Sequence, residues 1–308
     1  MKKVLVSFFI LLGLLAPIVI QGYWLQVFII SFYYAILAVS WSLLAGQLGL
    51  ISLGHVAFAA VGAYTSALLV INLHLPIYLG MLCGALGAAI VGLGIGILTL
   101  KMRGPYLTLT TLAFSEIFRN IVTAEYEITR GSYGLNTPLI FDGNKMYIYY
   151  LGFFLLLLCC LTYAKLLRTR IGLFFVAMRE DEVGALSRGI SILRYRLYAF
   201  VLTSAFAGLA GGYYAHVIGL VSPQMTILNE MGLVLAMGVF GGFESIIGPI
   251  FGALFLQPLA EFLRTFVEWR LAIFSGVVLL VLKYNADGVY PQIQMMCRSL
   301  IQKFSRTG

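Results

Sequence analysis

Charged residues are scarce in this chain. Asp, Glu, Lys and Arg make up 10% of its 308 residues, whereas 61% are hydrophobic and the mean hydropathy is +0.98. Soluble globular proteins carry about 25% charged residues, so this composition excludes a large soluble domain. It is typical of a polytopic membrane protein, and we predict an all-α helical bundle formed by a single domain, residues 1–308.

Cysteine is rare as well, with four residues in the chain. Cys83, Cys159 and Cys160 fall in apolar stretches and Cys297 lies near the C-terminus, at no spacing typical of metal ligands. We therefore expect no disulfide and no metal site. The cysteines are expected to pack as small hydrophobic residues.

The sequence also lacks the motifs of enzymes. It contains no Gly-x-x-x-x-Gly-Lys phosphate loop, no His and Glu at metal-binding spacing and no nucleophile elbow. His74 fits an outer turn, and His55 and His216 are interpreted as packing residues, with a place in a transport pathway as the alternative. We predict a chain that is not an enzyme and binds no cofactor itself.

Basic residues are few outside four clusters. Fifteen of the twenty Lys and Arg lie within Met1–Lys3, Lys101–Arg103, Lys165–Arg196 and from Lys283 to the C-terminus. Because cytoplasmic loops of membrane proteins carry an excess of positive charge, these clusters and both termini are predicted to be cytoplasmic. The net charge of +8 is then explained by the topology and by contact with anionic lipid headgroups. No nucleic-acid partner is expected.

Ten apolar stretches predict about ten membrane spans, joined by short loops. They are residues 4–20, 23–45, 50–71, 78–100, 106–121, 146–164, 197–219, 230–247, 249–267 and 271–282. The connection 123–145 is polar and too long for an ordinary turn. It is predicted to lie outside, either as a mobile cap or as a contact for an external partner.

The fifth stretch contains an acid, Glu116, with Arg119 three residues later. A charge at the centre of a bilayer costs about 2.5–3.5 kcal/mol, so Glu116 is predicted to face the bundle and to pair with Arg119. A structural ion pair near the outer interface and a substrate contact remain alternatives. The same spacing recurs at Glu261 and Arg264, which raises the hypothesis of a duplicated half.

The segment Lys165–Arg196 is too polar to lie in the membrane. Its residues Val183, Leu186, Ile190 and Leu193 recur at helical spacing and predict a short amphipathic helix that docks on a partner. Glycine weakens helices, so we expect a bend near Gly189, after which Ser191 caps the next helix. The residues predicted for this docking role are Arg179, Glu180, Asp181, Glu182, Val183, Gly184, Leu186, Gly189 and Ile190.

Several short motifs are distributed in order along nearly the whole chain. They are Ser52–His55 with Ala57-Phe58 and Gly62–Tyr64; Arg103–Tyr106 with Thr111–Phe114 and Glu116; Ala177–Glu182 with Gly189-Ile190 and Tyr195–Phe200; Ser204–Gly208 with Ala210-Gly211; and Gly241-Gly242 with Ser245 and Gly248-Pro249. Together they resemble the permease subunits of bacterial branched-chain amino acid ABC importers, the LivM class. The chain departs from the family pattern at Gly184, Arg130, Tyr133 and Phe243-Glu244, which leaves open the substrate, whether branched-chain amino acids or related amino acids or amides.

The resemblance implies a function and a set of partners. The chain is expected to be a permease of an inner-membrane importer that works by alternating access, with Arg179–Gly189 as the coupling helix that enters a groove of an ATPase subunit. The implied partners are a second, LivH-like permease, two ATPase subunits that bind ATP and Mg²⁺, and a periplasmic substrate-binding protein.

A translocation pathway is predicted along the small residues of the third stretch and the polar residues of the fifth. Its members are Ser52, Gly54, His55, Phe58, Gly62, Tyr64, Thr108, Thr111 and Glu116. For Gly62 a simple helix-packing contact is the alternative. The alternative for the whole chain is a secondary transporter that uses Glu116, Glu244 or Glu261 as ion carrier, or a channel for small polar solutes such as urea.

Overall fold

The computed structural model describes residues 22–99, 102 and 104–265, with positions 13, 16, 17 and 20 before them and 275, 276, 278, 279, 283 and 288–292 after them. The predicted first and tenth spans, 4–20 and 271–282, fall mostly outside the described residues, and both termini and Cys297 fall outside them altogether. The other eight predicted spans fall within the described part of the chain, apart from a few residues at their ends.

Helices make up most of the described chain, which confirms the predicted all-α fold. The predicted spans correspond to α2 (Tyr23–Ser42), which continues as the π-helical turn η1 (Leu43–Gln47), and to α3 (His55–Leu73), α4 (Ile77–Thr99), α5 (Pro105–Ala124), α7 (Lys145–Leu167), α10 (Ile192–Ile218), α11 (Leu228–Gly241) and α12 (Ile247–Phe262). Five of them, α2 with η1, α3, α4, α7 and α10, are long and apolar enough to cross a membrane. The chain is therefore a multi-pass membrane protein.

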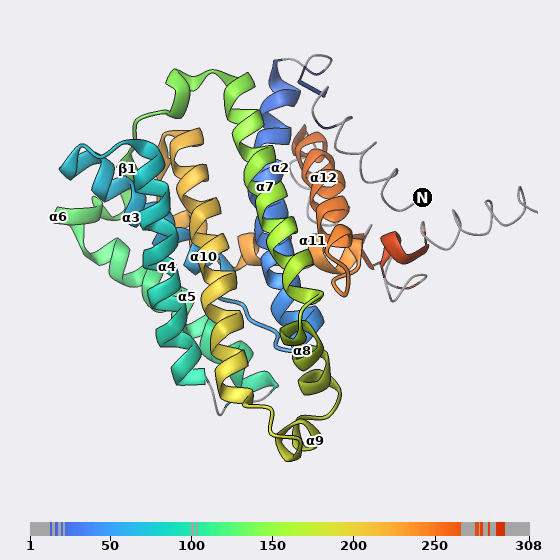
Figure 1. Cartoon of the computed structure of the whole chain (residues 1–308). Coiled ribbons are helices and arrows are strands. Elements are labelled where there is room, and N and C mark those ends of the chain that lie inside the picture. The colour runs from blue at the N-terminus through green and yellow to red at the C-terminus, as the bar shows by residue number, and fades with distance from the viewer. Residues whose placement is uncertain are drawn as a thin grey trace, which may run out of the picture.

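Short elements connect these helices. They are α6 (Tyr126–Thr129), η2 (Gly131–Tyr133), η3 (Ile140–Gly143), α8 (Arg170–Glu180), α9 (Glu182–Ser187), η4 (Pro223–Thr226) and η5 (Leu263–Thr265). Two strands, β1 (Leu135–Asn136) and β2 (Leu220–Val221), pair antiparallel. α8 and α9 lie at one end of the bundle, the lower end in Figure 1, and η3 lies at the other. We call these the basic end and the loop end.

Helix α2 forms the centre of the described bundle (Figure 1). It is apolar on all sides, and a helix of that kind is stable only when other helices surround it. α7, α10, α11 and α12 pack against it and bury nearly all of its length beyond the first turn. The sequence predicts a span here, but not its central place.

Helices α3, α4 and α10 pack closely through small residues. A Cβ atom on Gly62 of α3 would lie 2.2 Å from the carbonyl oxygen of Gly208 in α10, and one on Gly84 of α4 would lie 2.4 Å from the carbonyl oxygen of Gly62. Only glycine allows backbones to approach this far. At Gly62 and Gly84, glycine therefore allows the close packing of these helices.

The segment at the loop end is tied to α10. Nδ1 of His216 in α10 lies 2.9 Å from the carbonyl oxygen of Pro138. Because a carbonyl oxygen only accepts, Nδ1 is the donor. Nε2 of the neutral ring then accepts a hydrogen bond from the hydroxyl of Ser66 (3.0 Å). Thr137 adds a hydrogen bond to the carbonyl oxygen of Ala215 (2.7 Å). The prediction that His216 is a packing residue is confirmed, and the segment is not a free cap.

Candidate functional site

The predicted docking segment forms two short helices at the basic end. α9 follows α8 after one residue, Asp181, whose Oδ1 accepts from the backbone N–H groups of Val183 (3.1 Å) and Gly184 (3.0 Å). Asp181 is thus the N-cap of α9, a role that stabilises a helix by about 0.5–2 kcal/mol. A Cβ on Gly184 would lie 2.2 Å from Asp181 Oδ2, so glycine suits this close approach.

The acidic run of the segment has three separate roles. Glu180 is exposed, Asp181 caps α9, and Glu182 forms an ion pair with Arg196 of α10 (3.3 Å). The side chains of Glu182 and Arg196 are 22% and 12% exposed, so this pair fastens α9 to the span that follows. The sequence predicted one docking surface for all three acids. The structure instead gives each acid a different role.

The predicted apolar stripe is partly wrong. α9 ends at Ser187, so Leu193 belongs to α10 and the four residues do not share one helix. Val183 and Leu186, 69% and 50% exposed, do present apolar surface on α9, while Ile190 is partly buried. The short helix therefore displays two apolar side chains that no described residue covers.

The predicted bend at the end of the segment is confirmed. Gly189 has a φ of +81°, in the left-handed region that favours glycine, directly before the chain enters α10. Ser191 occupies the N-cap position of α10, but its side chain makes no capping hydrogen bond, so that part of the prediction is wrong.

Arg179 joins three segments at the basic end. From the last turn of α8 its guanidinium donates to the carbonyl oxygen of Gly46 in η1 and forms an ion pair with Glu244, in the turn between α11 and α12. Gln47 Nε2 donates to the backbone carbonyl of Glu244 (2.9 Å). A Cβ on Gly46 would lie 2.1 Å from the carbonyl oxygen of Phe243, so this junction is tightly packed.

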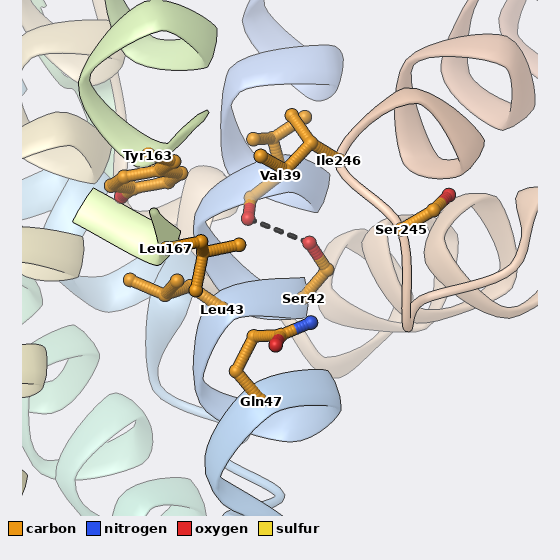
Figure 2. A pocket seen from close by; sticks show the side chains of 8 residues that line it. All are labelled: Val39, Ser42, Leu43, Gln47, Tyr163, Leu167, Ser245 and Ile246. Atoms are coloured by element: carbon orange, nitrogen blue, oxygen red, sulfur yellow. Dashed lines mark hydrogen bonds between the residues drawn. The ribbon is translucent and has the colours of Figure 1, made fainter. Parts of the chain in front are cut away.

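A very small cavity lies beside this junction (Figure 2). It measures about 10 Å³ and is lined by Val39, Ser42, Leu43, Gln47, Tyr163, Leu167, Ser245 and Ile246. The hydroxyl of Ser42 donates to the carbonyl oxygen of Val39 (2.8 Å), the bond drawn in Figure 2. A single water needs about 10–15 Å³, so an amino acid has no room here.

The chain between η1 and α3 is non-helical. Gly62 lies opposite Gly84 of the antiparallel α4, so α3 begins about eight residues, or roughly 12 Å, short of the α4 terminus at the basic end. Irregular backbone at such a depth must find partners within the protein. They are Trp41 Nε1, which donates to the carbonyl of Ser52 (3.0 Å), and the hydroxyls of Thr108 and Thr111, which bond the backbones of Ile51 (2.8 Å) and Leu53 (2.9 Å).

His55 begins α3 directly after this break and is fully buried. Neither ring nitrogen has a hydrogen-bond partner of normal geometry among the described residues. The prediction that His55 is a packing residue does not account for this, because buried polar groups are almost always paired. Four of the predicted pathway residues, Ser52, Gly54, Thr108 and Thr111, surround the same break.

Five rings connect α3 with α5. His55 and Phe58 of α3 are followed by Phe114 and Phe118 of α5 and then by Tyr64 of α3, with successive ring centroids 5.2–6.4 Å apart. The hydroxyl of Tyr64 is buried and has no hydrogen-bond partner among the described residues. The structure thus brings the predicted pathway residues Phe58 and Tyr64 to one interface, whereas Gly62 packs against α10.

Glu116 and Arg119 form the predicted ion pair (2.5 Å), with side chains 36% and 38% exposed. The sequence predicted that Glu116 faces the interior of the bundle. Its exposure places it at the edge of the bundle instead. Beyond the pair, toward the loop end, is an open cleft of about 240 Å³. It was not predicted from the sequence, because three distant segments form it. Its lining residues are Arg119, Asn120, Thr123, Ser132, Pro223, Gln224 and Ile227.

Comparison with known proteins supports the assignment of the family. The family model of the branched-chain amino acid transport system / permease component matches residues 23–282. The chain is 29% identical to the high-affinity branched-chain amino acid transport system permease protein LivM of Escherichia coli, over 94% of this chain and 75% of that protein, and 31% identical to LivM of Salmonella typhimurium, over 84% and 68%. A probable branched-chain amino acid transport permease protein LivH of Methanocaldococcus jannaschii is 27% identical, over 68% and 70%.

No solved structure matches the chain significantly. The family match covers every described span, including the broken start of α3, the Arg179 junction and the two helices at the basic end. The chain therefore belongs to the family of permease components of branched-chain amino acid transport systems, the transmembrane part of ABC importers.

Proposed function

We propose that the chain is one of two permease subunits of an ATP-driven importer, which moves branched-chain amino acids across the bacterial inner membrane by alternating access. The observation that carries this proposal is the docking helix α9. It presents Val183 and Leu186 to the surface while its cap at Asp181 and its ion pair from Glu182 to Arg196 fix its position. A rigid helix with uncovered apolar side chains suits a groove on another protein.

The partner at the basic end is an ATPase subunit, one for each permease. ATP and Mg²⁺ bind to these subunits, and this chain contributes no catalytic group and no cofactor. α9 follows α8 after a single residue, and Arg179 at the end of α8 contacts η1 and the turn before α12. Movement of the ATPase is thereby passed to three parts of the bundle at once.

The partner at the loop end is a periplasmic substrate-binding protein. Tyr126 and Tyr133 are 64% and 82% exposed on a segment that is fastened to α10, and Arg130 lies between them with a φ of +58°. Tyr and Arg dominate the binding energy of many interfaces. The departures from the family pattern at Arg130 and Tyr133 fall on this surface and suit recognition of a particular binding protein.

In this topology the basic end and both termini are cytoplasmic. The state described has room for a small solute at the loop end, in the cleft beside Arg119, and almost none at the Arg179 junction.

Reconstitution tests the proposal. Vesicles that hold this permease, its permease partner, the ATPases and the binding protein should accumulate leucine only when ATP is supplied, and vesicles with this chain alone should match empty ones. Accumulation by this chain alone under a proton gradient would contradict the proposal and favour a secondary transporter. The pairing of Glu116, Glu244 and Glu261 with Arg119, Arg179 and Arg264 argues against a free ion-carrying carboxylate.

A further inference from the structure

The cleft beside Arg119, which we call the outer cleft, is held open by fixed walls. Its α5 and η4 walls are joined by the hydroxyl of Ser115, which donates to the carbonyl oxygen of Thr226 (3.2 Å). Its η2 wall is fastened through Thr129, the last residue of α6, whose hydroxyl donates to the carbonyl oxygen of Val122 (2.6 Å) and accepts from the backbone N–H of Gly131 in η2 (3.3 Å). Binding sites for small molecules are usually preformed in this way.

The guanidinium of Arg119 has unused donors at this cleft. It carries five N–H groups, and among the described residues it makes one ion pair, from Nη2 to Glu116. Its Nε is buried and has no hydrogen-bond partner among them, and its Nη1 forms no hydrogen bond with a described residue either. Arginine binds carboxylates through two parallel hydrogen bonds, so this side chain is equipped to accept an anionic group from the cleft.

The chemistry of the cleft combines both signs of charge with a small apolar surface. Arg119 supplies a cation at the wall, and Glu116, which is paired with Arg119 but does not line the cleft, supplies an anion beside it, while Asn120, Thr123, Ser132 and Gln224 supply polar groups. Pro223 and Ile227 are its apolar residues. A ligand that carries a carboxylate, an ammonium group and a hydrocarbon side chain matches all three features.

We propose that the outer cleft receives the substrate from the binding protein and holds its α-carboxylate on Arg119 and its α-ammonium group near Glu116, with the hydrocarbon side chain against Pro223 and Ile227. This inference rests on the proposed function, because it takes the substrate to be an amino acid. The opposite charges of the ion pair make the site neutral overall, as the zwitterion is. A compound with only one of the two charges leaves Arg119 or Glu116 without a partner, which costs affinity.

Protection of a cysteine from a thiol reagent tests the site without reliance on transport. Ser132→Cys is introduced into a permease whose four cysteines are replaced by alanine, and the full complex is reconstituted. Leucine at twice its Kd for the outer cleft should slow the reaction of this cysteine about threefold. Leucinamide, which lacks the carboxylate, and 4-methylpentanoate, which lacks the ammonium group, should not slow it.

Matched variants separate binding from structure. Arg119→Gln should abolish protection by leucine and Arg119→Lys should weaken it, whereas Arg264→Gln, which breaks the equivalent pair with Glu261 (3.1 Å), should leave it unchanged. A cysteine at Asn72, exposed in the last turn of α3 and not in the lining of the cleft, reports whether each variant is folded and should react at one rate throughout. Equal protection in Arg119→Gln, or equal protection by leucinamide, would overturn the proposal.

The same complexes distinguish this inference from the proposed function. If the wild-type complex imports leucine but Ser132→Cys is never protected, the outer cleft is not the site and the importer assignment stands. If the wild-type complex does not import leucine, the proposed function fails, and with it the identity of the ligand proposed here.

Discussion

Arg179 and Glu244, 65 residues apart in the chain, form an ion pair that joins the last turn of α8 to the turn between α11 and α12. The same guanidinium donates to the carbonyl oxygen of Gly46 in η1. π-Helical turns inside α-helices are frequent at functional sites, and η1 leads directly to the broken start of α3 at His55. Arg179 thus connects α8, which precedes the docking helix, to the segment that leads to the predicted pathway.

We predict that loss of Arg179 is more harmful than loss of Glu244. Glu244→Gln removes a half-exposed ion pair, worth about 0–1 kcal/mol. Arg179→Gln also removes a charged hydrogen bond to Gly46, worth about 1.5–3 kcal/mol. Import per ATP hydrolysed, measured on reconstituted complexes, should therefore fall further in Arg179→Gln. An equal fall in both variants would show that the contact with Gly46 is unimportant.

The orientation of the chain is open to a direct test. Thr169, between α7 and α8, and Tyr133, at the loop end, are both exposed. With the native cysteines replaced, an impermeant thiol reagent added to intact cells should label Tyr133→Cys and not Thr169→Cys. Thr137 belongs to the same outer segment but is buried, so it is unsuitable as a reporter. The reverse pattern of labelling would invert the proposed topology.

Several features of the fold and the site follow from local patterns. The spans follow from apolar runs, the Glu116–Arg119 pair from i, i+3 spacing on one helix, and the bend at Gly189 from glycine next to a turn. In each case the residues that decide the feature lie close together in the sequence. Spacing along the sequence then decides the geometry.

The features that the sequence did not predict depend on contacts between distant segments. Whether Asp181 faces a partner or caps α9 is decided by where α8 ends, and Glu182 finds Arg196 only when α9 folds back on α10. The outer cleft needs α5, η2 and η4 together. The predicted pathway roles of His55 and its neighbours stay predictions, since contacts within one chain do not show what passes along it.

Substitution of Gly62 tests whether this residue serves helix packing or lines the passage. An alanine there places a Cβ 2.2 Å from the backbone of Gly208, whereas Gly94, in α4, has nothing within 4 Å of an added Cβ. Gly62→Ala should destabilise the complex by about 1–3 kcal/mol, as overpacking does, and Gly94→Ala should be neutral. Thermal unfolding of the purified complexes measures both. Equal stability of the two variants, with transport lost only in Gly62→Ala, would favour a passage-lining role for Gly62.

The docking helix gives the last prediction, because its apolar and charged residues are expected to contribute unequally. Truncation of a central apolar anchor in an interface costs about 2 kcal/mol or more, whereas an exposed ion pair contributes about 0–1 kcal/mol. Leu186→Ala should therefore weaken association with the ATPase more than Glu180→Ala, which removes the exposed acid at the end of α8. Asp181→Ala is not a matched charge control, since it also removes the cap of α9.

Asp181→Asn separates the cap from the charge, because asparagine caps helices about as well as aspartate. If Asp181 acts through the cap, Asp181→Asn should bind the ATPase like the wild type and Asp181→Ala should bind more weakly. Pull-down and ATP hydrolysis on the same reconstituted complexes measure these effects. Unchanged association in Leu186→Ala would mean that α9 is an exposed connector, and the ATPase would then have to contact the permease elsewhere on the basic end.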